Sequence, residues 1–148
     1  MIFIGCDRAG TVLKEAIMSY LDENSIKFED LSLSPEDTRN DYVMVGKAVA
    51  TKVSENSKDH IGILCCGTGL GMSMVANKIS GIRAAVCDNE YSVAMSRKHN
   101  DANILCLGGR IIAPEFAIEL VKIFLSTDFE GGRHKTRVDE ISTIDGSI

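Results

Sequence analysis

The segment Cys66-Gly67-Thr68-Gly69-Leu70-Gly71 combines a thiol, a hydroxyl and three closely spaced glycines. Glycines at every second position let the backbone fold closely with several N–H groups pointing inward, and a helix that starts behind them adds the positive end of its dipole. Such a cavity suits an anion, or an oxygen that becomes one during a reaction. Because Cys66 and Thr68 can exchange protons, we expect an acid, a base and an anion hole in one loop.

Three other interpretations of this loop compete with a catalytic one. A dinucleotide-binding fingerprint requires glycine where Met72 stands, although Asp88 lies at a suitable distance for a ribose contact. A P-loop requires Lys followed by Ser or Thr after its last glycine, and this sequence has no such pair there. The glycines can also make a simple strand-to-helix turn with Cys66 as a buried apolar residue, as most unpaired cysteines are. On this loop alone, that structural interpretation is as good as the functional one.

A second group of residues with possible chemistry lies in the tail, residues 128–148. Arg133 and Arg137 are four residues apart, so on a helix their guanidinium groups can converge on one anion. Taken alone, this cluster is better explained as a solvated basic turn. The tail also carries a thin apolar stripe, and a terminal helix of this kind often packs on a partner subunit. The stripe consists of Val138, Ile141 and Ile144.

Short apolar runs alternate with helical periods along the chain. The expected strands are 2–4, 26–28, 61–64, 84–87 and 104–107, and the expected helices are 12–21, 41–53, a helix from about 72, 91–98 and 114–124. We expect the first helix to bury a face that includes Val12, and the polar stretch around Pro35 to be a loop. This alternation predicts one three-layer α/β/α, Rossmann-like domain over residues 1–148, with a five-stranded parallel sheet and a C-terminal helical tail.

A parallel sheet of this type positions the candidate residues. Its ligands bind beyond the carboxyl ends of the strands, at the point where the strand order reverses. Asp7 and Arg8 follow the first strand, and the Cys66 loop follows the third. The end of the fifth strand adds Arg110 to the same edge.

Composition restricts the class of partner. The chain has 148 residues, the size of one domain, and its formal net charge of −5 argues against nucleic acid and acidic membranes, which leaves small anions for the arginines. Five cysteines show neither metal-type spacing nor an even count, which indicates reduced thiols in a cytosolic protein. The chain enters a strand at once, and no apolar run has membrane-spanning length. We expect a cytoplasmic protein.

Five further motifs accompany the glycine loop, in order along the chain. They are Gly5-Cys6-Asp7, Asn77-Lys78, Gly81-Ile82-Arg83, His99-Asn100-Asp101 and Glu130-Gly131-Gly132-Arg133-His134. With these motifs the chain resembles the type B ribose-5-phosphate isomerases over essentially its whole length. The glycine loop is shared with related sugar-phosphate isomerases, whereas the last two motifs point to the ribose enzyme. The resemblance implies isomerisation of D-ribose 5-phosphate to D-ribulose 5-phosphate, in the non-oxidative pentose phosphate pathway, without metal or cofactor.

The resemblance also implies residue roles. Cys66 matches the base that takes a proton from C2 and returns it at C1, and a helix N-terminus ringed by amides can stabilise its thiolate. Thr68 would move a proton between the two oxygens of the cis-enediolate, and His99 would open the furanose ring, with Asp7 assisting or binding sugar hydroxyls. The expected substrate-binding residues are Gly67, Gly69, Leu70 and Gly71 through their N–H groups, Tyr42 and Asn100 at the sugar, and Arg8, Arg110, Arg133 and Arg137 at the phosphate.

The sequence departs from the family pattern at two positions. Arg8 stands where histidine is usual, and Val43 stands where proline usually follows Asp-Tyr. Arg8 can still bind phosphate, but the change leaves the substrate open. One alternative is an isomerase of six-carbon sugars or their phosphates, such as allose 6-phosphate or, with less support from the His-Asn-Asp motif, galactose 6-phosphate. Another is a non-catalytic phosphosugar-binding module.

The resemblance finally implies a homodimer, or a dimer of dimers, with shared active sites. In this arrangement His99, Asn100 and Arg110 come from one chain, and Asp7 and the Cys66 loop come from the other. The motivation is that six separate segments of one small domain would have to supply ligands to one site.

Overall fold

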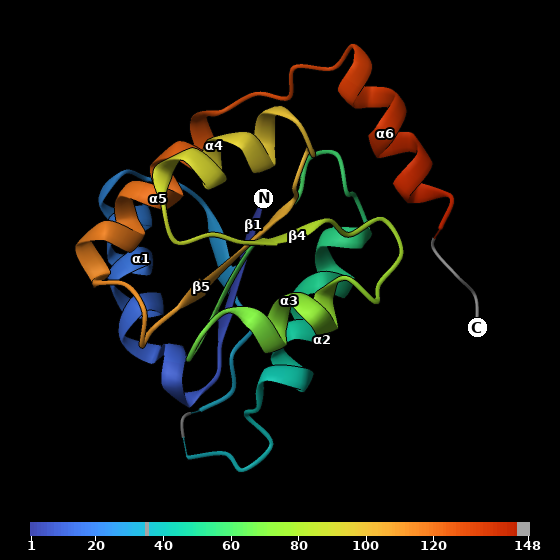
Figure 1. Cartoon of the computed structure of the whole chain (residues 1–148). Coiled ribbons are helices and arrows are strands. Elements are labelled where there is room, and N and C mark those ends of the chain that lie inside the picture. Colours follow the sequence, from blue (N-terminus) through green and yellow to red (C-terminus); the bar gives the residue numbers. More distant parts are fainter. Residues whose placement is uncertain (35, 145–148) are drawn as a thin grey trace.

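Short apolar segments form five parallel strands in the computed structural model, which describes residues 1–34 and 36–144 (Figure 1). The strands are β1 (Ile2–Cys6), β2 (Phe28–Asp30), β3 (Ile61–Cys66), β4 (Ala84–Val86) and β5 (Ile104–Gly108). Their order in the sheet is β2-β1-β3-β5-β4, and every pairing is parallel. The chain passes from β1 to β2 on one side of β1 and then to β3 on its other side, so the carboxyl ends of β1 and β3 are neighbours at the point where the strand order reverses. The predicted α/β class is confirmed.

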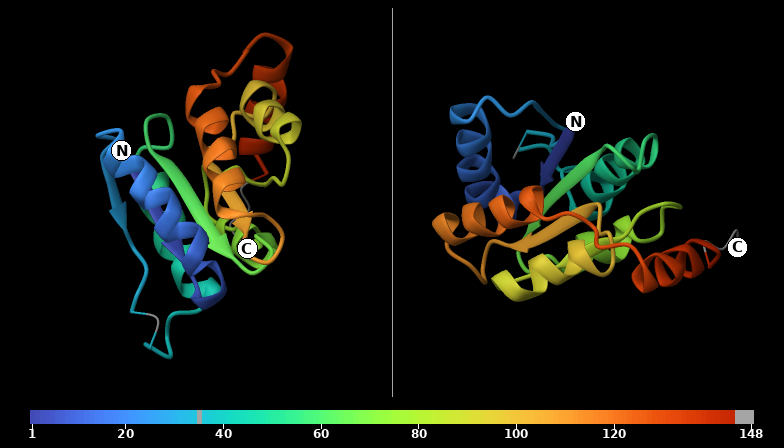
Figure 2. Two further views of the ribbon diagram at one scale, coloured as in Figure 1. Left: turned by 90° about the vertical axis from the view of Figure 1, so that its left-hand side faces the viewer. Right: turned by 90° about the horizontal axis from the view of Figure 1, so that it is seen from above.

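Helices cover both faces of this sheet (Figure 2). They are α1 (Thr11–Glu23), α2 (Tyr42–Ser54), α3 (Leu70–Ala76), α4 (Glu90–Lys98), α5 (Pro114–Ser126) and α6 (Arg133–Ser142), with a short 3-10 turn η1 (Arg8–Gly10). Side chains of α1, α4 and α5 form one core with one face of the sheet, and those of α2 and α3 form the other. Pro114 is the first residue of α5, as expected for a residue without an N–H group.

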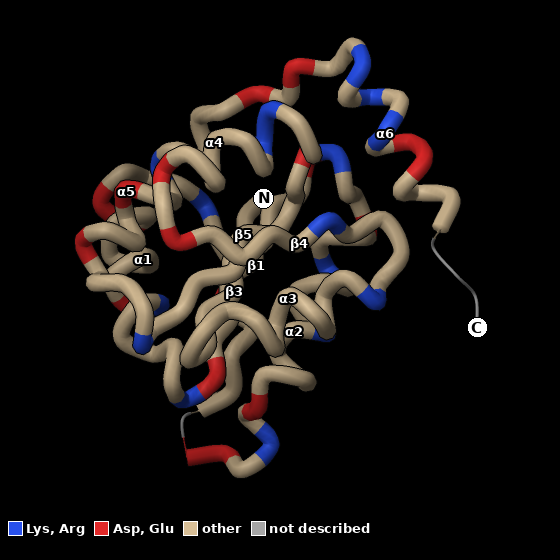
Figure 3. The backbone as a smooth tube through the Cα atoms, in the orientation of Figure 1, with Lys and Arg blue, Asp and Glu red and all other residues tan. Residues whose placement is uncertain are grey.

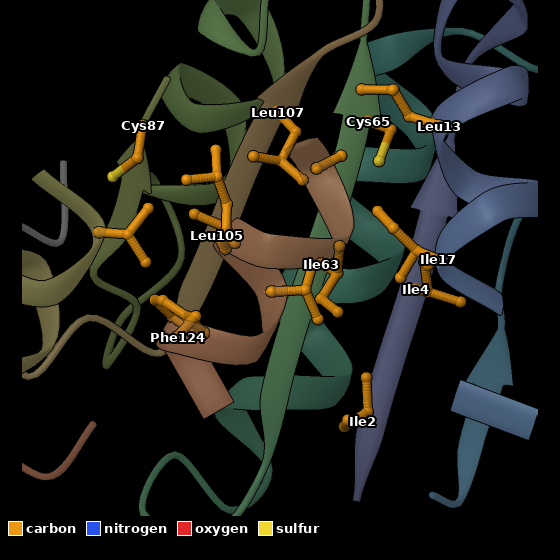
Figure 4. Close-up of a cluster of buried hydrophobic side chains, with 14 of the residues drawn as sticks. Ile2, Ile4, Leu13, Ile17, Ile63, Cys65, Cys87, Leu105, Leu107 and Phe124 are labelled. Carbon is orange, nitrogen blue, oxygen red and sulfur yellow. The ribbon is translucent and has the colours of Figure 1, made fainter. Parts of the chain in front are cut away.

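Alternation along β3 sends consecutive cysteines to opposite faces. Cys65 belongs to the core under α1 and α5, shown in Figure 4, whereas Cys66 belongs to the core under α2 and α3. Cys65 is fully buried, and burial raises the pKa of its thiol well above the ordinary value. Two adjacent thiols therefore have different surroundings.

Several boundaries differ from the sequence prediction by one or two residues, and two of them affect the site or have a clear physical cause. The second strand begins at Phe28 instead of Ile26, because the N–H of Ile26 caps α1 by donating to the Leu21 carbonyl at 2.9 Å, with Ser25 in a left-handed conformation. The glycine loop contains only residues 67–69, because β3 continues through Cys66 and α3 begins at Leu70.

Val12 was predicted on the buried face of the first helix and is exposed instead. The buried stripe of α1 has a spacing of four residues, and Val12 lies about 100° around the helix from its nearest member. The buried members are Leu13, Ile17 and Leu21.

The tail forms helix α6, which projects from the helices that cover the sheet in both Figure 1 and Figure 2. Of the predicted apolar stripe, Val138 is buried, whereas Ile141 and Ile144 are exposed. Pro35 and the last four residues of the predicted tail, 145–148, lie outside the described residues. Within the described ranges, no helix has the length and apolar character that crossing a membrane requires.

Candidate active site

The sulfur of Cys66 lies at the start of the glycine loop. Cys66 is the last residue of β3, and its Sγ accepts a hydrogen bond from the N–H of Gly69 at 3.1 Å. Gly69 can point its amide this way because its φ of 79° is left-handed, a conformation that costs a residue with a side chain about 1–2 kcal/mol. The next amide, that of Leu70, donates to Thr68 Oγ1 at 3.3 Å. The loop therefore holds both its thiol and its hydroxyl through its own backbone.

The end of β5 fixes the loop from the neighbouring strand. The N–H of Gly109 donates to the Cys66 carbonyl at 2.7 Å, and the N–H of Arg110 donates to the Gly67 carbonyl at 3.0 Å. A Cβ added to Gly67 would lie 3.1 Å from Arg110 Nη1, so the guanidinium group lies directly against the loop. Within one chain, Arg110 therefore lies with the Cys66 loop. The expectation of a shared site had grouped it with His99 instead.

Asp7 and Tyr42 border the same loop. The Asp7 N–H donates to the Cys65 carbonyl at 3.2 Å, and its Oδ1 accepts from the N–H groups of Ala9 and Gly10 at 2.9 and 3.2 Å. These bonds fix the carboxylate beside the end of β3. The Tyr42 ring lies against Gly71, where an added Cβ would be 2.9 Å from the ring.

A pocket of about 390 Å³ opens between β1 and the start of α2. Its lining residues are Asp7, Arg8, Asp37, Thr38, Asn40, Asp41 and Tyr42. Two of its carboxylates are already engaged: Asp41 Oδ1 accepts from the Met44 N–H at 2.8 Å, and hydrogen bonds from Arg39 lower the pKa of Asp37 to about 2. The pocket therefore combines carboxylates with one guanidinium group, that of Arg8.

Asn40 is a pocket residue that the sequence analysis did not identify. It is 9% exposed, its Oδ1 accepts from the Leu33 N–H at 3.3 Å, and its Nδ2 has no hydrogen-bond partner among the described residues. An unpaired buried donor is costly, so Nδ2 is a candidate donor to a molecule bound in this pocket. A polar residue directly before the capping Asp41 was the available signal.

The remaining predicted residues gather at the opposite edge of the sheet. His99 caps the end of α4, and its ring stacks on His134 of α6 with centroids 4.2 Å apart. This segment leads into β5 through Asn103, whose carbonyl accepts from the N–H of Gly62 near the start of β3. From Gly62 to Cys66 the strand covers four steps of about 3.3 Å, or roughly 13 Å. Within one chain, the His99 group and the Cys66 group therefore lie at opposite ends of β3.

Electrostatics at this second edge are dominated by cations. Lys and Arg positions follow one another along the first half of α6 (Figure 3), among them Arg133 and Arg137. Burial of the His134 ring lowers its pKa, and the neighbouring His99 and Arg133 lower it further. The neutral imidazole is thus favoured in a cationic patch that suits an anion.

Asp101 of the His-Asn-Asp motif has a structural role. Its carboxylate pairs with Arg83 at 3.1 Å and with Arg97 at 3.1 Å, and its φ of 47° is left-handed. Arg83 Nε also donates to the Asn100 carbonyl at 3.1 Å. The two arginines, which the sequence analysis did not single out for this role, hold the turn that carries His99 and Asn100.

Comparison with known proteins identifies the family. The family model described as Ribose/Galactose Isomerase matches residues 2–141. This chain belongs to that family. The ribose-5-phosphate isomerase B of Escherichia coli is 42% identical over 144 residues, which cover 97% of this chain and 95% of the relative. The crystal structure of ribose-5-phosphate isomerase B from Mycoplasma genitalium with bound ribulose-5-phosphate matches with a TM-score of 0.94 at 39% identity, covering 99% of this chain and 97% of that one.

Membership of the ribose/galactose isomerase family confirms the resemblance inferred from the sequence motifs, and with it the isomerase class. Overall identity does not choose the sugar, however. A galactose-6-phosphate isomerase subunit of Streptococcus pyogenes is 43% identical over 141 residues, which cover 95% of this chain and 96% of the relative. Because this identity is within one percentage point of that to the ribose enzyme of E. coli, the substrate has to be argued from the residues of the site.

Proposed function

We propose that this protein interconverts D-ribose 5-phosphate and D-ribulose 5-phosphate, as a step of the non-oxidative pentose phosphate pathway in the cytoplasm. The observation that carries the proposal is the Cys66 thiol, held by the Gly69 amide at 3.1 Å beside the pocket of Asp7 and Tyr42. The structurally similar Mycoplasma genitalium protein has ribulose-5-phosphate bound. The motifs of both groups, His99-Asn100 and Arg133-His134 included, support the ribose substrate.

The chemistry is a proton transfer between two carbons. The Cys66 thiolate removes the proton from C2 of the open-chain aldose, and the electron pair of the broken bond forms the C1–C2 double bond of the enediolate. Thr68 moves a proton from one enediolate oxygen to the other, and the thiol returns its proton to C1. Since the Gly69 amide donates to Sγ, it stabilises the thiolate. The Leu70 amide donates to Thr68 Oγ1, so the amides of Gly67 and Gly71 receive the charge on oxygen in this proposal.

The second group of residues supplies ring opening and phosphate binding in this proposal. His99 moves a proton from the anomeric hydroxyl to the ring oxygen, and Asn100 holds a sugar hydroxyl. Arg133 and Arg137 bind the phosphate from α6, with geometry that lysine could not supply. Arg110 and Arg8 extend the phosphate site from the Cys66 side.

A homodimer with shared active sites brings the two groups together. Two observations support it: the groups lie at opposite ends of β3, which covers roughly 13 Å from Gly62 to Cys66, and apolar side chains are exposed around the glycine loop. Leu70 is 51% exposed and Met74, one turn later on α3, is 66% exposed, with Tyr42 and Val43 also exposed beside them. A second copy that covers this rim with its His99 edge and α6 would bury these side chains and complete both sites.

The proposal is tested by a paired substitution on β3. Cys66→Ala should lower kcat with ribose 5-phosphate by about a hundredfold to ten-thousandfold, the usual contribution of a positioned base, with little change in KM. Cys65→Ala, which faces the other core, should retain activity. Equal losses in both variants would exclude Cys66 as the base, and full activity in Cys66→Ala would favour a different mechanism or a binding module.

A six-carbon sugar phosphate is the second candidate substrate, favoured by Arg8 in place of the usual histidine and by the 43% identity to a galactose-6-phosphate isomerase subunit. The test measures kcat/KM for ribose 5-phosphate and allose 6-phosphate side by side. We expect ribose 5-phosphate to be preferred, and a preference for allose 6-phosphate would reassign the substrate.

A further inference from the structure

Three side chains with metal-binding groups meet at the edge of the sheet opposite the glycine loop. They are His99 at the end of α4, Glu130 in the segment before α6, and His134 in the first turn of α6. One ligand atom from each lies within 4.8 Å of the other two, and this is the one such group of three found among the described residues. The set contains two imidazoles and one carboxylate.

Backbone hydrogen bonds hold the three residues together without help from a ligand. The Glu130 N–H donates to the Lys98 carbonyl at 3.1 Å, next to His99. The His99 N–H donates to the Met95 carbonyl at 2.9 Å, and the His134 N–H donates to the Gly131 carbonyl at 3.1 Å. The segment before α6 is thereby fastened to the end of α4, so the cluster is a fixed feature of the fold.

The Glu130 carboxylate has charged neighbours, but its ion pairs are long. Oε2 lies 3.9 Å from His134 Nε2, and Oε1 lies 3.7 Å from Lys98 Nζ. Charge-assisted hydrogen bonds are shorter, at about 2.7–2.9 Å. The Glu130 side chain is 50% exposed and that of His134 is 13% exposed. An ion can therefore approach from solvent on the Glu130 side, toward the edges of the two stacked rings that carry the nitrogen atoms.

Two imidazoles and one carboxylate suit Zn²⁺ better than harder ions. Zinc binds His nitrogen and Glu oxygen at about 2.0–2.2 Å in tetrahedral geometry, and sites with three protein ligands keep the fourth position for water. Tetrahedral ligands at that distance lie about 3.4 Å apart, so the ligand atoms must close by little more than 1 Å. One imidazole must also turn out of the 11° stack, because the nitrogen lone pairs lie in the ring planes. Calcium and magnesium prefer oxygen ligands, which this cluster offers only once.

We propose that His99, Glu130 and His134 form a zinc site whose occupation inhibits the isomerase reversibly. The inhibition rests on the proposed function, in which His99 moves the proton that opens the sugar ring. A zinc ion occupies the nitrogen lone pair that this proton transfer requires, so metal binding and ring opening exclude each other. Arg133, on the same turn of α6 as His134, adds positive charge that weakens zinc affinity and that substrate phosphate would neutralise.

The test uses the full-length protein freed of metal with a chelator, in a buffer without phosphate. Zn²⁺ is titrated in competition with a chromogenic chelator, and Co²⁺ is used as a spectroscopic probe because its visible absorption reports tetrahedral coordination. We expect one ion per chain in the wild type. Glu130→Gln should weaken Zn²⁺ binding by about tenfold or more, while it leaves kcat and KM for ribose 5-phosphate and the thermal unfolding temperature unchanged.

Two control variants keep the interpretation unambiguous. Glu119→Gln changes a glutamate of similar exposure on α5, which pairs only with the nearby Lys122 in the described salt bridges, and it should not change Zn²⁺ binding. Cys66→Ala removes the thiol that could bind zinc by itself, and it should retain the site. Unchanged affinity in Glu130→Gln, or loss of binding in Cys66→Ala alone, would overturn the proposed site.

Inhibition is measured separately from binding. Zn²⁺ should inhibit the wild type at the concentrations at which it binds, and should inhibit Glu130→Gln only at concentrations about tenfold higher or more. Binding that depends on Glu130 but leaves turnover unaffected would overturn the inhibitory role. A protein without ribose 5-phosphate isomerase activity that still binds the ion through Glu130 would refute the proposed function and leave the zinc site established.

Discussion

Mixing two inactive variants should restore activity if two chains build each active site. Cys66→Ala removes the base, and His99→Ala removes the group that opens the ring. The two residues belong to groups at opposite edges of the sheet, separated by most of the length of β3. In a homodimer of either variant, both sites lack one essential group, so each protein alone should show almost no turnover.

The size of the recovery follows from the geometry. Random pairing of the two variants makes about half of the dimers heterodimers. In a heterodimer, one site combines both substitutions and the other combines neither. Over the whole mixture, one active site in four is then intact on average, so the rate should reach about a quarter of the wild-type rate. A dimer of dimers gives the same fraction.

The assay is co-refolding of equal amounts of the two variants, followed by the ribose 5-phosphate isomerase rate. Different affinity tags on the two chains allow the heterodimer to be isolated and shown to be present. Cys66→Ala with Asp7→Asn is the matched control pair, because Asp7 follows the strand next to β3 and joins the same edge. That pair should show no recovery.

Two results would refute the reasoning. Isolated Cys66→Ala with His99→Ala heterodimers without activity would mean that each site is built within one chain. Recovery in the Cys66→Ala with Asp7→Asn pair would mean that these two residues act in different sites, which contradicts their positions at the same edge.

Three further predictions concern the glycine loop and its pocket. Iodoacetamide should modify Cys66 faster than the other four cysteines, because burial raises the pKa of each of those thiols and Cys66 has an amide donor on its sulfur. Bound substrate should protect Cys66 from the reagent. Faster labelling of any other cysteine would relocate the reactive thiol. Arg8→Ala should raise KM for ribose 5-phosphate by about tenfold or more, the effect of losing a hydrogen bond to a charged group, and should have little effect on KM for unphosphorylated ribose. Arg8→His should retain most activity. Equal effects of Arg8→Ala on both sugars would mean that Arg8 has a structural role. Gly69→Ala and Gly81→Ala impose the same backbone strain, about 1–2 kcal/mol, because these glycines have φ of 79° and 78°. Only Gly69→Ala should also lower kcat, because its Cβ would press on Val86 and the Cys106 carbonyl at 3.2–3.3 Å. Equal kcat in both variants would mean that the Gly69 amide has no role in catalysis.

The order of elements and the chemistry of the loop were predictable from local sequence. Periodicity of apolar residues identified all five strands, because a buried parallel strand needs a continuous apolar run. Because β3 continues through both cysteines, its alternation places Cys65 and Cys66 on opposite faces. The glycine spacing predicted the tight loop, because few other residues tolerate the left-handed backbone at Gly69.

Boundaries were less predictable, because hydrogen-bond competition decides them. The apolar side chain of Ile26 suits a strand, but its N–H is needed to end α1, and the strand starts two residues later. Likewise, the pairing of Cys66 with Gly108 extends β3 into the glycine loop and shortens that loop to three residues.

The grouping of functional residues depends on tertiary structure alone. Strand order places Arg110 against Gly67. The segment before α2 brings Asn40 to the pocket that Asp7 also lines, although these residues are far apart in sequence. The proximity of His99 and His134 at the proposed zinc site requires the segment before α6 to be fastened to the end of α4. A sequence lists the groups that can react, but distances between them follow from which strands pair, and pairing is set by long-range contacts that leave no local pattern.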